Sequence, residues 1–133
     1  EKARAERLAA GLAHVTVLPK LNLAGVAAEL AGARACVAVD TGLGHLAAAL
    51  DVPTVSLYGP TNPGFTGAYG RGQVHLASDF PCAPCLKKRC AYQPSAEERQ
   101  RFDLASEQPL CFTRLNPPRV AAELAALLPA RIA

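Results

Sequence analysis

The sequence has no tryptophan and no methionine, and its aromatic content is only 5%. The net charge of +3 is too small to indicate a nucleic-acid-binding surface by itself. Charged residues, glycines or prolines interrupt each apolar run before it reaches membrane-spanning length. Residues 1–10 carry mixed charges without an apolar core, which a signal peptide requires. These shortages argue against nucleic-acid-binding, membrane-spanning and exported proteins.

Cysteine is present, but in a number that does not suit a disulfide framework. An odd count of five, with no export signal, argues against a secreted scaffold and favours a reducing environment. We therefore expect a cytoplasmic protein. The sequence does not begin with methionine, and its first residues already have helical character, so we also expect a piece of a longer protein.

Half of the 133 residues are hydrophobic, which is enough to build one domain with a sizeable core. Apolar spacing and short β-branched runs alternate along the chain, and this order is typical of an α/β fold. It predicts a Rossmann-like parallel sheet with helices on both faces. The predicted helices are 1–12, 23–33 (with Asn22 as N-cap), 44–50 and 117–128, and the predicted strands are 14–18, 35–39, 54–58 and 73–77. The run at 35–39 is apolar throughout, as expected of a strand buried on both faces.

Two polar, glycine-containing loops follow predicted strands, at Asp40–His45 and at 59–72. Ligands of parallel α/β sheets bind beyond the carboxyl ends of the strands, so we predict that these two loops form the ligand-binding site. In the first loop, a helix N-terminus can offer N–H groups to an anion, and glycines allow close approach. Asp40 would repel a phosphate but could hold sugar hydroxyls. A capped turn without a ligand explains the same residues and remains an alternative.

Several common nucleotide and hydrolase motifs are missing from the first loop. Its spacing matches neither G-x-G-x-x-G nor the Walker A pattern, which disfavours a dinucleotide dehydrogenase and a P-loop ATPase. The sequence also lacks the G-x-S-x-G nucleophile elbow of α/β-hydrolases.

The segment "VAVDTGLGHLAAALDVPTVSLYGPTNPGFTGAYG" closely resembles the C-terminal half of the bacterial lipopolysaccharide heptosyltransferases, glycosyltransferase family 9. Its Asp-Thr-Gly-Leu-x-His form is more similar to type I than to type II enzymes. The resemblance is strong over 1–77, weak over 78–116, and returns in the last helix. It implies the C-terminal half of a GT-B fold, in which residues 1–133 bind the nucleotide-sugar donor. Residues 78–116 contain four cysteines, several prolines and a charge run with little periodicity, and we predict that they form a partly ordered, cysteine-rich excursion.

The resemblance also implies a reaction. The enzyme would be an inverting glycosyltransferase that binds ADP-heptose and transfers heptose to Kdo–lipid A, at the cytoplasmic face of the inner membrane, without a cofactor or metal. An N-terminal domain absent from this chain would bind the acceptor and supply the general base, so no catalytic residue is expected here and the chain alone should be inactive. The donor-binding residues implied are Asp40 (heptose hydroxyls), Thr41, Gly42 and Leu43 (diphosphate, through N–H groups), His45 (phosphate or sugar), Glu1 (ribose) and Leu21 (adenine).

Four cysteines, Cys82, Cys85, Cys90 and Cys111, gather in the excursion with one C-x2-C pair. Four thiolates can hold zinc tetrahedrally, but the second C-x2-C that marks strong zinc sites is missing. We therefore favour free or variably oxidised thiols over a structural zinc site. The adjacent basic run 87–89 could meet the anionic acceptor or membrane, although a solvated loop explains it more simply.

Two other functions fit parts of the sequence. One is a zinc-stabilised interaction module that uses the cysteine loop to bind a partner; the low charge and scarce aromatics argue against nucleic acid as that partner. The other is a nucleotide-sugar epimerase of the same two-domain fold, which would also use an acid and a glycine loop at a strand end.

Overall fold

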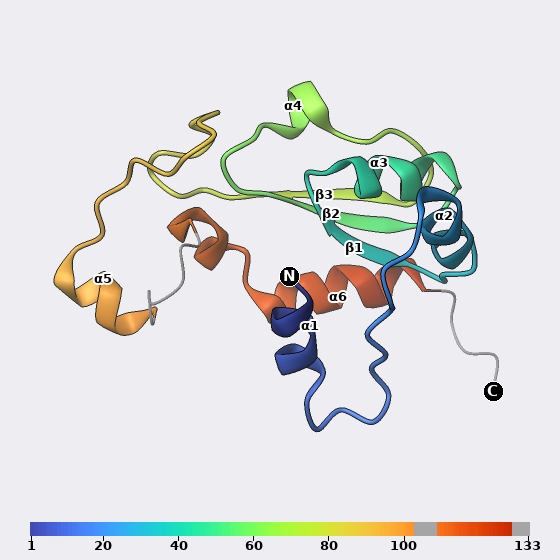
Figure 1. Ribbon diagram of the computed structural model, residues 1–133. Coiled ribbons are helices and arrows are strands. Elements are labelled where there is room, and N and C mark those ends of the chain that lie inside the picture. The colour runs from blue at the N-terminus through green and yellow to red at the C-terminus, as the bar shows by residue number, and fades with distance from the viewer. Residues whose placement is uncertain (103–108, 129–133) are drawn as a thin grey trace.

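The computed structural model describes residues 1–102 and 109–128, which build helices around one three-stranded sheet (Figure 1). The elements are α1 (Lys2–Ala9), α2 (Leu23–Ala31), β1 (Cys36–Val39), α3 (Gly42–Ala49), β2 (Thr54–Tyr58), α4 (Pro63–Thr66), β3 (Gln73–Ala77), α5 (Ala96–Arg101), the 3₁₀ helix η1 (Leu110–Arg114) and α6 (Pro117–Leu127).

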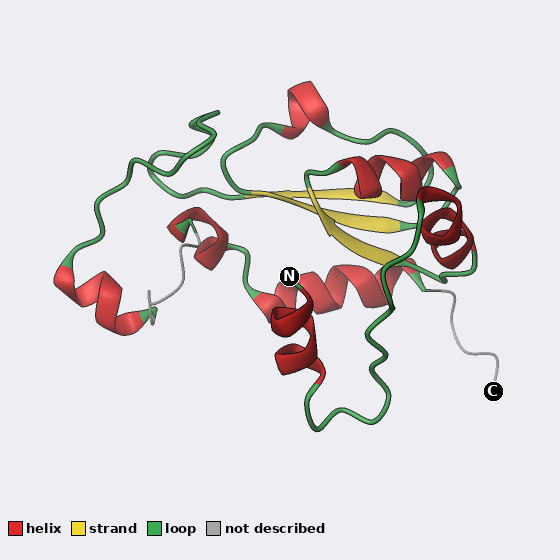
Figure 2. Ribbon diagram, viewed as in Figure 1, coloured by secondary structure: helices red, strands yellow, loops and turns green. Residues whose placement is uncertain are grey.

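The three strands are parallel and lie in the order β1–β2–β3 (Figure 2). Cys36 pairs with Thr54, and Thr54 pairs with Gln73. Parallel neighbours need a crossover, which α3 provides between β1 and β2 and the α4 segment provides between β2 and β3. The carboxyl ends of the strands therefore share one edge, and the segments that follow β1 and β2 meet there.

Helices cover both faces of this sheet (Figure 1). On one face α3 packs against β1 and β2, with α2 beside α3, and on the other face α6 packs against β2. The α6 side holds the main core, where Val55, Leu76 and Leu115 are buried. Each such aliphatic side chain contributes about 1.5–3 kcal/mol when fully buried. The predicted fold class, a parallel α/β sheet with helices on both faces, is confirmed.

Most predicted elements are present with shifted bounds. Asn22 caps α2 as predicted, because its side-chain oxygen accepts a hydrogen bond from the N–H of Gly25 at 2.8 Å. Pro117 opens α6, and its fixed φ suits a first helical residue. The third helix begins at Gly42 rather than at residue 44, so much of the predicted loop is helical.

Two predictions about strands are wrong. Residues 14–18 form no strand; the N–H of Val15 instead bonds to the carbonyl of Leu12, and most side chains there are exposed. A β-branched run becomes a strand only where a neighbour pairs with it. β1 is not buried on both faces either, since Val37 and Val39 are 42% and 45% exposed. They continue the surface that α6 covers, but α6 packs chiefly on β2.

Residues 78–116, where little regular structure was predicted, contain α5 and η1 around a second small core of Phe80, Leu110 and Cys111. Two backbone hydrogen bonds tie this excursion to the sheet domain. The N–H of Ser78 donates to the carbonyl of Tyr58 at 2.8 Å, and the N–H of Leu86 donates to the carbonyl of Pro60 at 2.8 Å. None of the helices within residues 1–102 and 109–128 is long and apolar enough to cross a bilayer.

Candidate functional site

The site begins where β1 ends and α3 starts. Asp40 follows the last residue of β1, and its N–H still bonds to the carbonyl of Leu57 at 3.2 Å, which fixes its backbone against β2. Thr41 is extended and serves as N-cap, and Gly42 and Leu43 form the start of the helix. Asp40, Thr41, Gly42, Leu43 and His45 therefore lie together at one strand–helix junction, as predicted.

The amino end of α3 suits an anion. The first N–H groups of a helix have no partner within it and carry its positive dipole end. In the described structure, the Thr41 side chain makes no capping hydrogen bond with these groups. A Cβ atom built on Gly42 would meet nothing within 4 Å, so the space beside this residue in the first turn is open. Backbone donors and open space are the two requirements for binding a phosphate.

The second glycine of this helix has a different role. Gly44 is buried, and a Cβ atom at this position would lie 3.2 Å from the Cβ of Ala38 and 3.4 Å from the carbonyl oxygen of Val39. Gly44 thus allows α3 to lie close against β1. The two neighbouring glycines therefore have separate roles: Gly44 allows close packing of α3 on β1, and Gly42 leaves open space beside the helix start.

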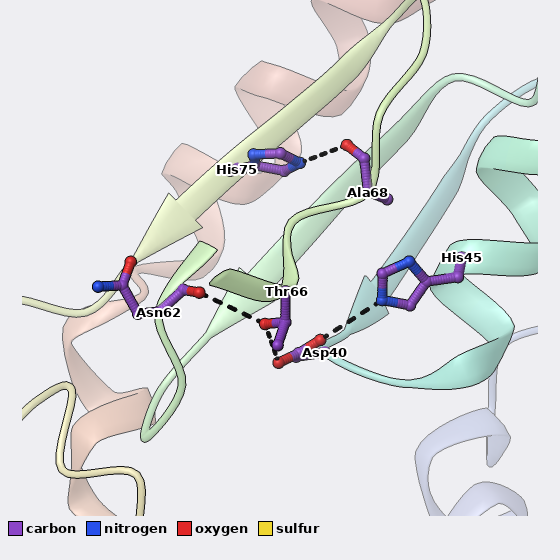
Figure 3. A network of polar contacts seen from close by, with 6 residues as sticks. All are labelled: Asp40, His45, Asn62, Thr66, Ala68 and His75. Atoms are coloured by element: carbon purple, nitrogen blue, oxygen red, sulfur yellow. Dashed lines mark hydrogen bonds and ion pairs between the residues drawn. The ribbon is translucent and has the colours of Figure 1, made fainter. Parts of the chain in front are cut away.

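Asp40 stands at the centre of a small polar network (Figure 3). Its side chain is 15% exposed, and its Oδ2 accepts a hydrogen bond from the Thr66 hydroxyl at 2.7 Å. Its Oδ1 lies 3.9 Å from Nε2 of His45, which forms an ion pair when the imidazole is protonated. The His45 side chain is 49% exposed. A carboxylate oxygen and an imidazole nitrogen thus face one another beside the helix terminus, where a polyhydroxylated group could bind both.

The second glycine-rich loop reaches the same place through α4. Asn62 caps this short helix by accepting a hydrogen bond from the N–H of Gly64 at 2.8 Å. Beyond α4, the His75 ring lies 2.9 Å from the Ala68 carbonyl oxygen and packs edge-on against Tyr58, with ring centroids 5.4 Å apart. The loop is therefore held at both ends while its middle approaches Asp40.

Thr66 is the site residue that sequence reasoning missed. The sequence predicted a second polar loop at 59–72 without assigning a binding role to any one of its residues, and the hydroxyl of that loop that reaches Asp40 belongs to Thr66. A signal for it exists in the sequence. Asn62 followed by Pro63 is a typical helix start, and a helical turn from Pro63 would end near Thr66.

Two predicted residues lie apart from this junction. Leu21 lies not at a strand end but against the first turn of α2, where a Cβ on Gly25 would be 3.2 Å from its Cβ. Glu1 is exposed at the start of α1, and within the described residues no hydrogen bond or ion pair joins its carboxylate to the Asp40–His45 segment. Roles for Leu21 and Glu1 in adenine and ribose binding stay predictions.

The cysteines of the excursion lie around one pocket next to Pro60. Cys82, Cys85, Cys90 and Cys111 all line it, and all four are free thiols. Among residues 1–102 and 109–128, no three histidine, cysteine or carboxylate side chains are placed so that they could hold a metal ion.

Burial changes the acidity of two cysteine thiols, Cys111 and Cys36. Burial raises the pKa of the Cys111 thiol, and the nearby Cys82, Cys85 and Cys90 raise it further. Burial likewise raises the pKa of Cys36, the half-buried first residue of β1. Both groups therefore stay protonated, and less nucleophilic, to higher pH than an ordinary thiol.

Comparison with known proteins identifies the family of this chain. The sequence pattern of glycosyltransferase family 9 (heptosyltransferase) matches residues 1–96. Lipopolysaccharide heptosyltransferase 1 of Pseudomonas aeruginosa is 77% identical over 128 residues, which are 96% of this chain and 36% of that protein. Lipopolysaccharide heptosyltransferase 1 of Escherichia coli K12 is 60% identical over 74 residues, 56% of this chain and 23% of that protein.

Solved structures point the same way. The E. coli heptosyltransferase WaaC with ADP is similar over 58% of this chain and 24% of its own, with a TM-score of 0.57 and 56% identity. WaaC with ADP-2-deoxy-2-fluoro heptose gives a TM-score of 0.53 and 53% identity, covering 58% of this chain and 23% of that one.

The chain thus spans about a third of the P. aeruginosa relative and about a quarter of the E. coli proteins. Within that span, the matched residues 1–96 include the whole β1–α3 junction and the loop that carries α4. The interaction-module and epimerase alternatives gain no support from these relatives. The chain belongs to glycosyltransferase family 9, the heptosyltransferase family.

Proposed function

We propose that this chain is the donor-binding part of an inverting heptosyltransferase that acts in lipopolysaccharide biosynthesis. The donor is ADP-heptose, and the complete protein transfers its heptose to the Kdo–lipid A inner core. Residues 1–133 form the nucleotide-sugar domain, and a further domain binds the acceptor and supplies an acidic base. The similarity to WaaC structures that hold ADP and a heptose analogue supports the choice of donor.

The observation that carries the proposal is the meeting of two kinds of binding group at one sheet edge. The amino end of α3 offers N–H groups beside open space at Gly42, which suits a diphosphate. Asp40 and His45, alongside, offer a carboxylate and an imidazole, which suit sugar hydroxyls. A diphosphate joined to a sugar has both requirements in one molecule.

This arrangement also serves the transfer step. The acceptor hydroxyl attacks the anomeric carbon from the face opposite the diphosphate, and the bond from that carbon to the diphosphate oxygen breaks. The acceptor proton passes to the base of the other domain, and ADP leaves with the bonding electrons. Negative charge grows on the departing diphosphate, where the N–H groups and dipole of α3 stabilise it. Asp40 holds the heptose while this happens.

The acceptor side lies outside the described site, and we propose that the complete protein works at the cytoplasmic face of the inner membrane. A basic run on the surface of this chain supports the proposal. Lys87, Lys88 and Arg89 form an exposed basic run in the excursion, and such a run is attracted to anionic lipid.

The test is a calorimetric titration of the full-length protein with ADP, GDP and ADP-heptose. We expect ADP to bind and GDP to bind more weakly. Gly42→Val should weaken ADP binding by at least about tenfold, which corresponds to about 1.4 kcal/mol, because its side chain enters the space meant for the diphosphate. Asp40→Ala should spare ADP but weaken ADP-heptose. A folded Gly42→Val variant that binds ADP as well as the parent would contradict the placement of the diphosphate.

A further inference from the structure

The two oxygens of the Asp40 carboxylate have different surroundings. Oδ2 accepts the Thr66 hydroxyl at 2.7 Å, whereas within residues 1–102 and 109–128 the polar neighbour of Oδ1 is His45 Nε2 at 3.9 Å (Figure 3). The first distance is that of a strong hydrogen bond to a charged acceptor, and the second is too long for a hydrogen bond. One oxygen is therefore engaged by the protein, and the other keeps its capacity to accept hydrogen bonds.

Thr66 itself is held in place. It is the last residue of α4, whose first turn Asn62 caps and whose end is closed by the N–H of Gly67 bonding to the carbonyl of Pro63 at 2.8 Å. Gly67 permits this tight turn, because a Cβ there would collide with the Pro63 carbonyl oxygen and lie 2.8 Å from Cε1 of His75. Hydrogen bonds at both ends of α4 therefore fix the position of the Thr66 hydroxyl.

The hydroxyl has a second acceptor, but a weaker one. The carbonyl oxygen of Asn62 lies 3.4 Å from the Thr66 Oγ1, against 2.7 Å for Asp40 Oδ2. A hydroxyl has one proton to donate, and the shorter contact to a carboxylate is the stronger. The proton therefore points at Asp40, across 26 residues of sequence, and joins the loop after β2 to the residue after β1.

We infer that Thr66 is a positioning residue for the donor sugar. It fixes the rotation of the Asp40 carboxylate, so that Oδ1 faces the site and accepts from sugar hydroxyls. A carboxylate that is already oriented loses less freedom when the sugar binds, and affinity for the sugar rises accordingly. The inference rests on the proposed function, because it assigns Asp40 to the sugar part of the donor.

The test compares Thr66→Val with Thr66→Ser in the full-length protein. Valine keeps the shape of threonine without the hydroxyl, and serine keeps the hydroxyl. We expect Thr66→Val to bind ADP like the parent but to bind ADP-heptose about tenfold more weakly, the loss of about one hydrogen bond to a charged group. Thr66→Ser should restore most of the ADP-heptose affinity. A merely structural role would change both affinities together.

A double-mutant cycle completes the test. In an Asp40→Ala background, Thr66→Val should have no further effect on ADP-heptose affinity, because the residue it positions is gone. Equal losses for ADP and ADP-heptose, additive effects with Asp40→Ala, or an unchanged Thr66→Val variant would each overturn the inference. If the parent binds ADP-heptose and Asp40→Ala weakens it selectively, such a result removes only the role of Thr66. If the parent binds neither ligand, the proposed function fails as well.

Discussion

At the scale of single residues, the site depends on two glycines, Gly42 and Gly44, that have different structural roles. Gly42 faces open space, whereas Gly44 faces Ala38 and the backbone of Val39. Both belong to the first turn of α3 and lie two positions apart. The same substitution at either position is therefore made in nearly the same helical backbone conformation. Substitutions at these two positions can therefore distinguish an effect on ligand binding, expected at Gly42, from an effect on the stability of the fold, expected at Gly44.

We expect Gly44→Val to lower the free energy of unfolding by about 1–3 kcal/mol or more, because α3 cannot approach β1 over a larger side chain. Gly42→Val is the matched control and should unfold at nearly the same denaturant concentration as the parent. Urea unfolding of the full-length protein, followed by circular dichroism, measures both. Equal midpoints for the two variants would show that the contact at Gly44 does not limit packing.

Residue chemistry made part of this site predictable. Asp40, Thr41, Gly42, Leu43 and His45 all lie within residues 40–45, so a strand followed by a helix brings them together without knowledge of the rest of the fold. The Thr66 contact could not be predicted in this way, since it depends on how a separate loop folds back over β1. Contacts between distant segments are set by packing, which a local pattern does not encode.

At the scale of elements, α5 shows how an irregular segment acquires structure. Ser95 and Glu98 form a capping box, in which the Ser95 side chain accepts from the N–H of Glu98 at 3.1 Å and the Glu98 carboxylate accepts from the N–H of Ser95 at 2.8 Å. Tyr92 donates a further hydrogen bond to this carboxylate at 3.0 Å. The sequence contains this Ser-x-x-Glu pattern, which is typical of a helix start, but the surrounding prolines and cysteines indicate an irregular segment.

The capping box predicts a pH dependence. The hydrogen bond from the Ser95 backbone, followed by that from Tyr92, lowers the pKa of Glu98 below the ordinary glutamate value of 4.5. A carboxylate with a depressed folded pKa stabilises the fold above its unfolded pKa, and this contribution is lost as the pH falls through the folded pKa. We expect the Ser95 amide resonance to shift on acidification with a midpoint below 4.5.

Proton–nitrogen correlation spectra recorded over a pH series measure that midpoint. Glu98→Gln is the control, because its amide cannot titrate and the Ser95 resonance should then stay in place. A midpoint at or above the ordinary glutamate value in the parent would mean that the box does not persist in solution.

Helices were easier to predict from the sequence than strands. α2 and α6 carry their own start signals, Asn22 and Pro117, and need no distant partner to be recognised. The segment 14–18 has strand composition but pairs with nothing in the described structure. Strand formation depends on a neighbouring edge, and composition alone says nothing about whether that edge is there.

At the scale of the whole molecule, the sheet is unevenly covered. α6 buries Val55 and the core around it, but Val37 and Val39 on the same face of β1 stay 42% and 45% exposed. Parallel sheets are normally covered on both faces. The relatives are much longer than this chain, which spans 36% of the P. aeruginosa protein. We therefore expect the rest of the complete protein to cover this part of β1.

Val39→Lys tests that expectation in the full-length protein. If the face is covered, the substitution forfeits about 1.5–3 kcal/mol of aliphatic burial and adds the cost of burying a charge, so the melting temperature should fall clearly. Val39→Ile, which keeps an apolar β-branched side chain, should melt close to the parent. Differential scanning calorimetry of the three proteins decides the matter. A Val39→Lys protein that melts with the parent would mean that β1 keeps a solvent-exposed face in the complete enzyme, and the strand would then be free to meet another molecule there.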